Sequence, residues 1–354
     1  MHAHGFLINV FNRISGLSVL ILLAIPGLGN EPDSLLSTDT VYYQSLSDKF
    51  SLYCYGITKL NSFELRNPQG NNMILYKPNE ALNLGLGFNY RWIGIGTAIN
   101  YVFLNNDNDI FGRTRSFDLQ GDIFTKSAVF TANLQTYKGF YWENAYEYDT
   151  TWRADSVPLR PDIFTLNVGA SGIYIKNNEK FSFKSVYSST EWQKRSAGSW
   201  LYGGQASYYQ LDADSNLVPT MLWESYPTYD SLVNLATFSF GFSIGYAYTY
   251  VIRQKFYIHA MWMLGIGLQY GHGIDSESNT VFVQGKPSGR THFRLALGSN
   301  NEDFYYGIAL ITESYPMRNQ LQSSFIYRYG RIRFFYGQHL NYTPGKHYKT
   351  KNRS

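Results

Sequence analysis

The sequence lacks the long apolar runs that mark helical membrane proteins. A membrane-spanning helix needs about 20 predominantly apolar residues, and the only candidate is the run from Leu17 to Ile25. It follows Arg13 and precedes Pro26-Gly27-Leu28-Gly29. A charged start, a short apolar core and small residues at its end are typical of a secretory signal peptide. We therefore expect residues 1–29 to be a cleaved signal peptide, with a membrane anchor as the alternative.

Cysteine is almost absent, since the chain has a single one, Cys54, which excludes an intramolecular disulfide. Cys54 also lies well after the cleavage region, so it is not the lipid-bearing cysteine of a lipoprotein. No cysteine or histidine cluster has zinc-site spacing, and no glycine-rich phosphate loop precedes a helix. The sequence thus predicts no metal site and no cofactor.

Charge is also scarce, because Asp, Glu, Lys and Arg make up only 16% of residues. The formal net charge of +4 is concentrated in the C-terminal tail, residues 344–354, which contains Lys346, Lys349, Lys351 and Arg353. The remainder of the chain is close to neutral, so the charge distribution predicts no nucleic-acid partner. We interpret the tail as a solvated basic extension, with a contact to anionic lipid or a partner as the alternative.

Aromatic residues are abundant instead, at 18% of the chain with 31 Tyr and 24 Phe. Between Ala236 and Ile252 they follow a strict two-residue period, with small or polar residues at the alternate positions. The chain turns at Arg253–Lys255 and repeats the pattern between Phe256 and Tyr270. A period of two is that of an extended strand. Both strands exceed the usual length of about 5–6 residues and reach the roughly 9–11 that cross a bilayer.

Similar alternation recurs along most of the chain, in residues 82–90, 93–103, 117–123, 130–134, 164–174, 293–297, 306–310, 325–329 and 332–342. Such faces are buried either against a second sheet or against lipid. The opposite face is rich in Gly, Ser, Thr, Asn and Gln rather than in charge, which favours lipid. Tyr and Trp near strand ends fit an aromatic girdle: Tyr90, Trp92, Tyr101, Trp200, Tyr250 and Tyr329.

The predicted fold class is therefore all-β, a single transmembrane antiparallel β-barrel over residues 47–343. We expect about 14 strands, with roughly 12 to 16 open, because such barrels usually have an even number. Residues 30–46 are predicted to be a flexible periplasmic lead-in. A tight turn is expected at Tyr329–Arg331, and the connection Asp212–Leu235 could contain one more strand at Leu217–Glu224. The predicted location is the bacterial outer membrane, with its lipid as a partner.

If the apolar parity faces lipid, the other parity lines the lumen. The lumen-facing candidates are Asp118, Asp122, Lys184, His259, His292, Arg294, Glu313, Arg328, Arg333 and His339. These charges could pair with one another in a plugged barrel, or line a water-filled pore. A hydrolase would need one of the histidines beside a serine such as Ser324 and an acid. Nothing in the local sequence fixes that geometry, so no catalytic residue is predicted.

Two connections look suited to contacts. Trp192–Trp200 places two cations between aromatics, and we interpret it as a surface turn, a constriction or a docking loop for anionic lipid or polysaccharide. Gly139–Arg160 is rich in aromatic and acidic residues and suits protein or sugar contacts, although it could fold over the barrel mouth. The loop-contact candidates are Gln193, Lys194, Arg195, Trp142 and Trp152.

The chain also resembles a Bacteroidota outer-membrane β-barrel family catalogued as a domain of unknown function. The resemblance rests on Lys77-Pro78-Asn79, residues 84–92, Phe117–Gln120, Tyr137–Tyr141, Arg160-Pro161-Asp162, Phe181-Ser182-Phe183 and, most specifically, Gln193–Ser199. It covers most of the region from Phe50 to Tyr342. It implies compartment and architecture, and it brings no catalytic residues.

These observations predict an integral outer-membrane β-barrel without enzymatic activity. We expect it to act as a structural or accessory component of an envelope complex through its loops, with other outer-membrane or periplasmic proteins as partners. The first alternative is a narrow channel or porin for small solutes. The second alternative is a barrel-borne lipid hydrolase.

Overall fold

The computed structural model describes residues 41–69, 72–90, 93–100, 107–153, 155–226, 231–275, 280–318 and 324–340. Its sheet strands are β2 (Phe50–Arg66), β3 (Met73–Lys77), β4 (Leu82–Tyr90), β5 (Ile93–Asn100), β6 (Arg115–Phe124), β7 (Ala128–Trp142), β8 (Leu159–Ile175), β10 (Ala197–Asp212), β11 (Leu232–Ile252), β12 (Phe256–Asp275), β13 (Thr280–Asn300), β14 (Phe304–Arg318) and β15 (Ser324–Leu340). Strands β1 (Tyr43–Ser45) and β9 (Glu191–Gln193) form a separate two-stranded sheet. The short helices are α2 (Asn108–Phe111), η3 (Ala145–Glu147), α3 (Lys184–Tyr187) and η4 (Thr220–Ser225).

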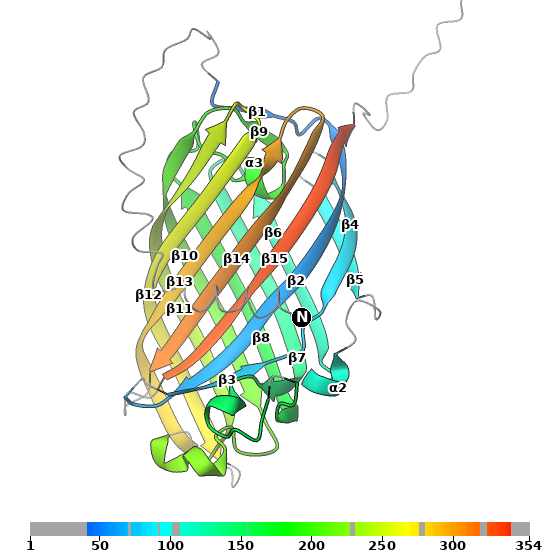
Figure 1. Cartoon of the computed structure of the whole chain (residues 1–354). Helices are drawn as coiled ribbons and strands as arrows, with labels where there is room; N and C mark the ends of the chain where they lie inside the picture. The colour runs from blue at the N-terminus through cyan, green and yellow to red at the C-terminus, as the bar shows by residue number, and fades with distance from the viewer. Residues whose placement is uncertain are drawn as a thin grey trace, which may run out of the picture. The chain divides into compact units, whose positions relative to one another are not determined.

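The long antiparallel strands close into a barrel (Figure 1). Neighbouring strands follow the order β15-β14-β13-β12-β11-β10-β8-β7-β3-β2, and β15 pairs back onto β2 from Ser324↔Arg66 to Leu340↔Phe50. This ring has ten strands. Closure leaves no free edge within the ring, and it therefore satisfies the backbone without a second sheet.

Three further strands, β4, β5 and β6, extend the wall on either side of β3, which is itself part of the ring. Strand β3 joins β2 to β7 at one end only, where Tyr76 pairs with Trp142 and Lys77 with Tyr141. Beyond it, the hairpin β4–β5 pairs with β2, and β6 pairs with β7. Within the described part of the chain, β5 pairs only with β4 and β6 only with β7. Two strand edges thus flank a seam in the wall, and we name it the β5/β6 seam.

The outward face of the barrel is apolar and exposed, as the alternation predicts. Phe242 is 77% exposed and its neighbour on the next strand, Ile266, is 80% exposed. The exposed outward side chains include Leu86, Ile123, Phe130, Val168, Trp200, Phe240, Ile244, Leu264, Phe334 and Tyr336. Their inward neighbours on β11 and β12, such as Ser243 and Met263, are buried. No helix in the described residues is long and apolar enough to cross a membrane.

The predicted count of about 14 strands is not reproduced, and β15 shows why. It runs unbroken through Tyr329–Arg331, where a turn was predicted. Phe325, Tyr327 and Tyr329 are buried and share the inward parity of Arg331 and Phe335. In the first half of β15 the apolar side chains face the lumen, and in the second half Phe334 and Tyr336 face outward. The apolar residues thus change from odd to even positions along one continuous strand, without a turn. The additional strand considered possible at Leu217–Glu224 is not formed, since η4 occupies most of that segment.

The two ends of the barrel differ. At the turn end, short connections join β11 to β12 and β13 to β14, and β1, β9 and α3 lie there (Figure 1). At the loop end lie α2, η3 and η4 (Figure 1). The predicted turn at Arg253–Lys255 is present, and Arg253 and Gln254 both have positive φ, 50° and 58°. Two such residues give the turn geometry that matches the twist of a hairpin.

The predicted flexible lead-in is corrected in its last residues. Tyr43, Gln44 and Ser45 form β1, which pairs with Gln193, Trp192 and Glu191 of β9, and Leu46 is buried. Main-chain hydrogen bonds from Lys194 and Arg195 to the Tyr42 carbonyl extend this contact. The predicted signal peptide and the basic tail lie outside the described residues.

Candidate functional site

The candidate site is the barrel lumen, because register places most of the buried charged side chains on its wall. Across β13, β14 and β15, Arg294 aligns with Ile311 and then Arg331. The next row runs from His259 on β12 through Ala296 on β13 and Ala309 on β14 to Arg333 on β15. Directly paired residues face the same side of a sheet, so these side chains share the interior. The site is therefore built from strands far apart in the sequence.

One buried ion pair anchors the wall near the middle of β13 and β14. The Arg290 guanidinium donates to both Glu313, through Nε at 3.1 Å, and Gln205, through Nη1 at 3.0 Å. Tyr315 donates its hydroxyl to the same carboxylate at 2.9 Å. Both charged side chains are buried, so the pair depends on this complete set of donors.

The two aspartates on β6 complete the charge pattern from the opposite wall. Asp118 accepts from Lys59 at 2.9 Å, from Gln135 and from the Tyr137 hydroxyl. Asp122 accepts from Arg331 at 2.6 Å and from Thr131 at 2.7 Å. These contacts connect β6 with β2 and β15 across the interior. Asp118 and Asp122 thus pair with basic side chains across the lumen, as the plugged-barrel alternative requires.

At the turn end the lumen is filled by the segment between β8 and β10, and we name residues 176–196 the plug. Phe181, Phe183, Val186 and Tyr187 of the plug are buried against inward side chains of the wall, including Met261 and Ala309. The Asn300 amide donates to the carbonyls of Ser185 and Glu191 at 2.9 and 2.8 Å. Asn89 donates to the carbonyl of Ser188 at 3.0 Å. The plug is therefore held by hydrogen bonds as well as by packing.

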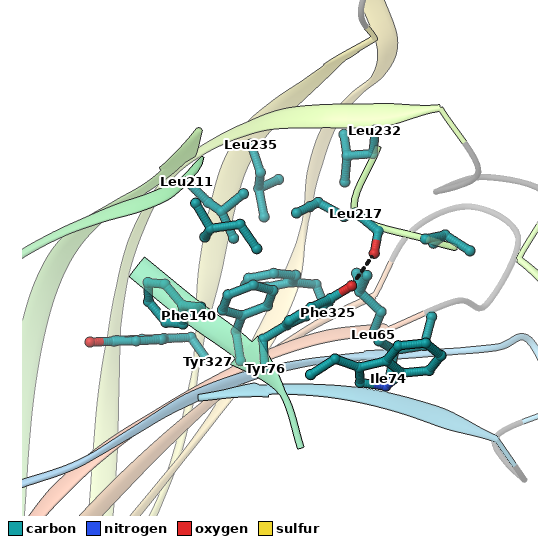
Figure 2. Packing of buried hydrophobic residues seen from close by; sticks show 14 of the residues in the cluster. Leu65, Ile74, Tyr76, Phe140, Leu211, Leu217, Leu232, Leu235, Phe325 and Tyr327 are labelled. Atoms are coloured by element: carbon teal, nitrogen blue, oxygen red, sulfur yellow. Dashed lines mark hydrogen bonds between the residues drawn. The ribbon is translucent and has the colours of Figure 1, made fainter. Parts of the chain in front are cut away.

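At the loop end an aromatic cluster fills the lumen (Figure 2). Its wall residues are Leu65, Phe140, Leu211, Leu235, Phe325 and Tyr327. Leu217 of the β10–β11 connection packs against them, and its carbonyl accepts from Tyr76 at 2.7 Å (Figure 2). Tyr148, after η3, packs on the cluster, and burial raises the pKa of its phenol. The cluster and the plug together close the lumen at both ends.

Two of the predicted lumen-facing residues, Lys184 and Arg328, do not project from the lumen wall. Lys184 belongs to the plug helix α3, where its ammonium lies 3.5 Å from Glu191, and not to a wall strand. Arg328 lies on the outward parity of β15 and pairs with Glu64 of β2. The other candidates, Asp118, Asp122, His259, His292, Arg294, Glu313, Arg333 and His339, point inward.

Several charged residues that face the lumen were missed from the sequence, among them Lys59, Glu80, Arg290 and Arg331. Arg331 lies in the predicted turn at Tyr329–Arg331, and Arg290 lies in β13 just before the predicted alternation at residues 293–297. Both share parity with recognised candidates, Arg331 with Arg333 and Arg290 with His292. Continuing each alternation by one to three residues finds them.

The loop-contact candidates are corrected in part. Gln193 is buried, and its amide donates to the carbonyls of Lys180 and Arg195 at 2.6 and 3.0 Å. Trp142 is buried in the aromatic cluster, so it is no exposed contact, and Trp152 packs partly buried beside it. Lys194 and Arg195 lie over the rings of Trp192 and Tyr42, at 4.6 and 4.9 Å from the centroids. They belong to the turn end of the barrel.

The arrangement for a hydrolase is incomplete. Ser324 pairs with Arg66 at the loop end, whereas the serine beside a histidine is Ser51, whose Oγ lies 2.7 Å from Nδ1 of His339. The Nε2 of His339 has no partner in the described residues, and Ser51 is only 2% exposed. A triad needs a carboxylate on the histidine and an accessible nucleophile. Among the described residues no group of His, Cys, Asp and Glu could hold a metal ion.

A shallow cavity of about 1150 Å³ lies on the outward wall and not in the lumen. Its lining includes Leu86, Ile258, Leu297, Ile308 and Phe334, all of them exposed except Ile308. It is apolar and carries no candidate chemistry.

Fold and lumen together define a closed antiparallel β-barrel with a filled interior. The chain belongs to the family described as "Domain of unknown function (DUF4421)", whose profile matches residues 37–338. No curated protein matches the chain in sequence.

Solved structures with similar folds are barrels from bacterial outer membranes. The outer membrane protease OmpT from Escherichia coli is 10% identical with a TM-score of 0.32, covering 86% of this chain and 99% of its own. The toluene transporter TodX from P. putida is 8% identical with a TM-score of 0.23, covering 83% and 91%. The outer membrane protein OprG from Pseudomonas aeruginosa is 8% identical with a TM-score of 0.22, covering 83% and 97%.

Proposed function

We propose that this protein is an integral β-barrel of the bacterial outer membrane that works by binding other envelope components and not by conduction or catalysis. The exposed outward face supports a membrane location, because side chains such as Phe242 and Ile266 would otherwise present a large apolar surface to water. Barrels of this kind have short periplasmic turns and longer external loops. The turn end, with the plug, would then face the periplasm.

The closed lumen carries this proposal. The plug fills one end, the aromatic cluster fills the other, and the ion pairs around Asp118, Asp122 and Glu313 cross the space between. A porin keeps a water-filled path past its charged side chains. Here Asp118, Asp122 and Glu313 are each paired with a basic side chain of the wall, so these pairs stabilise the barrel and do not line an open path.

The β5/β6 seam supports binding of a partner. A strand edge in hydrocarbon leaves backbone N–H and C=O groups without partners, at a cost of several kcal/mol for each group. An added polypeptide strand satisfies such groups by β-augmentation. Residues 94–99 of β5 are exposed on both faces, so this edge is open to a partner. The surface connections at the two ends, including Lys194 and Arg195, offer further contacts.

The structure bears on each of the two alternatives, a channel and a lipid hydrolase. A channel would require the plug to leave the lumen, but hydrogen bonds from Asn300 and Asn89 join the plug to the wall. A lipid hydrolase would use the pair of Ser51 and His339. Neither arrangement is complete, and both rank below partner binding.

Site-directed photocrosslinking in native outer membranes tests the proposal. A photoreactive amino acid at Ile95 or Thr97 of β5 should give a discrete crosslinked protein identified by mass. The same probe at Phe242, on the opposite wall, serves as the control and should give none. Equal crosslinking at all three positions, or only monomer, would contradict partner binding at the seam.

A further inference from the structure

The plug covers three arginines, Arg294, Arg331 and Arg333, which share one nearby carboxylate, Asp122. Arg331 is paired with Asp122, but among the described residues no carboxylate lies within ion-pair distance of Arg294 or Arg333. Arg294 is only 1% exposed. A buried charge without a partner is costly, and it is retained only if something compensates it. Arg294 also donates from Nε to Nε2 of His292 at 2.9 Å. Among the described residues, Arg294 and Arg333 thus share Asp122 with Arg331 and lack a carboxylate of their own.

Polar atoms without partners surround the same place. Nη1 of Arg294, Nε2 of His259 and the hydroxyl of Tyr257 are buried and have no hydrogen-bond partner in the described residues. His259 and Arg294 both contact the ring of Tyr187. Tyr257 aligns through Gly298 and Gly307 with Phe335, whose ring lies 5.0 Å from the Arg333 guanidinium. A buried polar group without a hydrogen-bond partner destabilises the folded protein. Tyr187, whose hydroxyl also has no partner in the described residues, lies beside Arg294 and His259, so a ligand at this one place could satisfy several of these atoms.

Only small side chains lie between His259 and Arg333 on the wall. Ala296 and Ala309 separate His259 from Arg333 along one row of the sheet. Tyr187 of α3 covers this place, with its ring 5.1 Å from the Arg294 guanidinium and 5.4 Å from the His259 ring. Its carbonyl accepts from Arg333 at 2.9 Å. The plug thus supplies a ring and a carbonyl, which are weak substitutes for a carboxylate or phosphate.

We propose that Arg294 and Arg333, with His259 and Tyr257, form a binding site for a phosphate-class oxyanion, for which α3 of the plug is the lid. Guanidinium groups bind such oxyanions through paired N–H donors, and the hydroxyl and imidazole add further donors. The anion enters when Tyr187 moves off the wall. The site is independent of any partner protein, and its ligand is either free phosphate or the phosphate of a lipid headgroup.

The test is calorimetric titration of the full-length protein, folded in neutral detergent, with inorganic phosphate and separately with phosphatidylglycerol in mixed micelles. Saturable binding of one of them is expected. Arg294→Gln and Arg333→Gln should each weaken it by at least about tenfold, while Lys255→Gln, in the exposed β11–β12 turn, should leave it unchanged. Tyr187→Ala should tighten it, because the lid no longer competes.

Heat-modifiable gel mobility establishes that each variant is folded, and Arg294→Lys replaces Arg294→Gln if the latter does not fold. Binding of phosphate alone identifies the free ion, and binding of the lipid alone identifies a headgroup site. Absence of saturable binding of either by the wild-type protein overturns the proposal. Binding that survives both arginine variants overturns it as well, because the anion would then lie elsewhere.

Discussion

At the scale of single residues, burial decides what a charge contributes. Glu313 and Arg290 are shut off from solvent and hold each other in the lumen, whereas Glu179 and Lys126 form a pair on the surface with side chains 78% and 56% exposed. Removing one partner of a buried pair leaves an isolated charge. An exposed pair contributes little, because water screens it.

We therefore expect Glu313→Gln to lower the free energy of unfolding by about 3–5 kcal/mol. The matched change Glu179→Gln should cost less than about 1 kcal/mol. Urea unfolding in detergent, followed by tryptophan fluorescence, measures both. Similar costs for the two variants would mean that the Glu313 site is hydrated.

The outward wall gives a second prediction at this scale. Ile266 is 80% exposed, so Ile266→Arg should lower the free energy of unfolding in lipid vesicles by about 2–4 kcal/mol if this position lies near the middle of the bilayer. Ile266→Leu is the control and should change it little. A neutral result for Ile266→Arg would place this face in water.

At the scale of strands, glycine makes room for lumen tyrosines on the neighbouring strand. A Cβ on Gly85 of β4 would lie 2.5 Å from the Tyr55 ring and from the Thr97 carbonyl oxygen. The Tyr53 ring covers Gly87 in the same way. These contacts seat the hairpin β4–β5 against β2 beside the β5/β6 seam.

Gly85→Ala should therefore destabilise the barrel by about 1–3 kcal/mol, because Tyr55 or the strand must move. Gly121 of β6 is a matched control, since a Cβ there meets nothing within 4 Å, and Gly121→Ala should be close to neutral. Thermal unfolding followed by gel mobility measures both. Equal effects would show that the hairpin is not fixed by these rings.

Strands also show how far the sequence can be read. The period of two predicts β11, β12 and the turn between them, because lipid-facing and lumen-facing residues there differ in polarity. It fails in β15, because Phe325, Tyr327 and Tyr329 are apolar but face the aromatic cluster. It gives the parity of Arg294 and Arg333, yet the approach of Tyr187 depends on the path of the plug, and no local pattern encodes that path.

At the scale of the whole molecule, the filled lumen separates this barrel from an open pore. The plug and the aromatic cluster close opposite ends, so removal of one closure alone is not expected to open a path. Stability and impermeability thus have the same origin, the packing of the interior. Function is left to the surfaces, the seam and the anion site.

Conductance across a planar lipid bilayer tests this central claim most directly. The full-length protein, folded and inserted, is predicted to give no steady ion current, and a variant in which residues 176–196 are replaced by a short glycine-serine turn should give none or only brief openings. Insertion is checked by protease protection of the same vesicles. A steady open-channel current from the wild-type protein would contradict the closed lumen and favour the channel alternative.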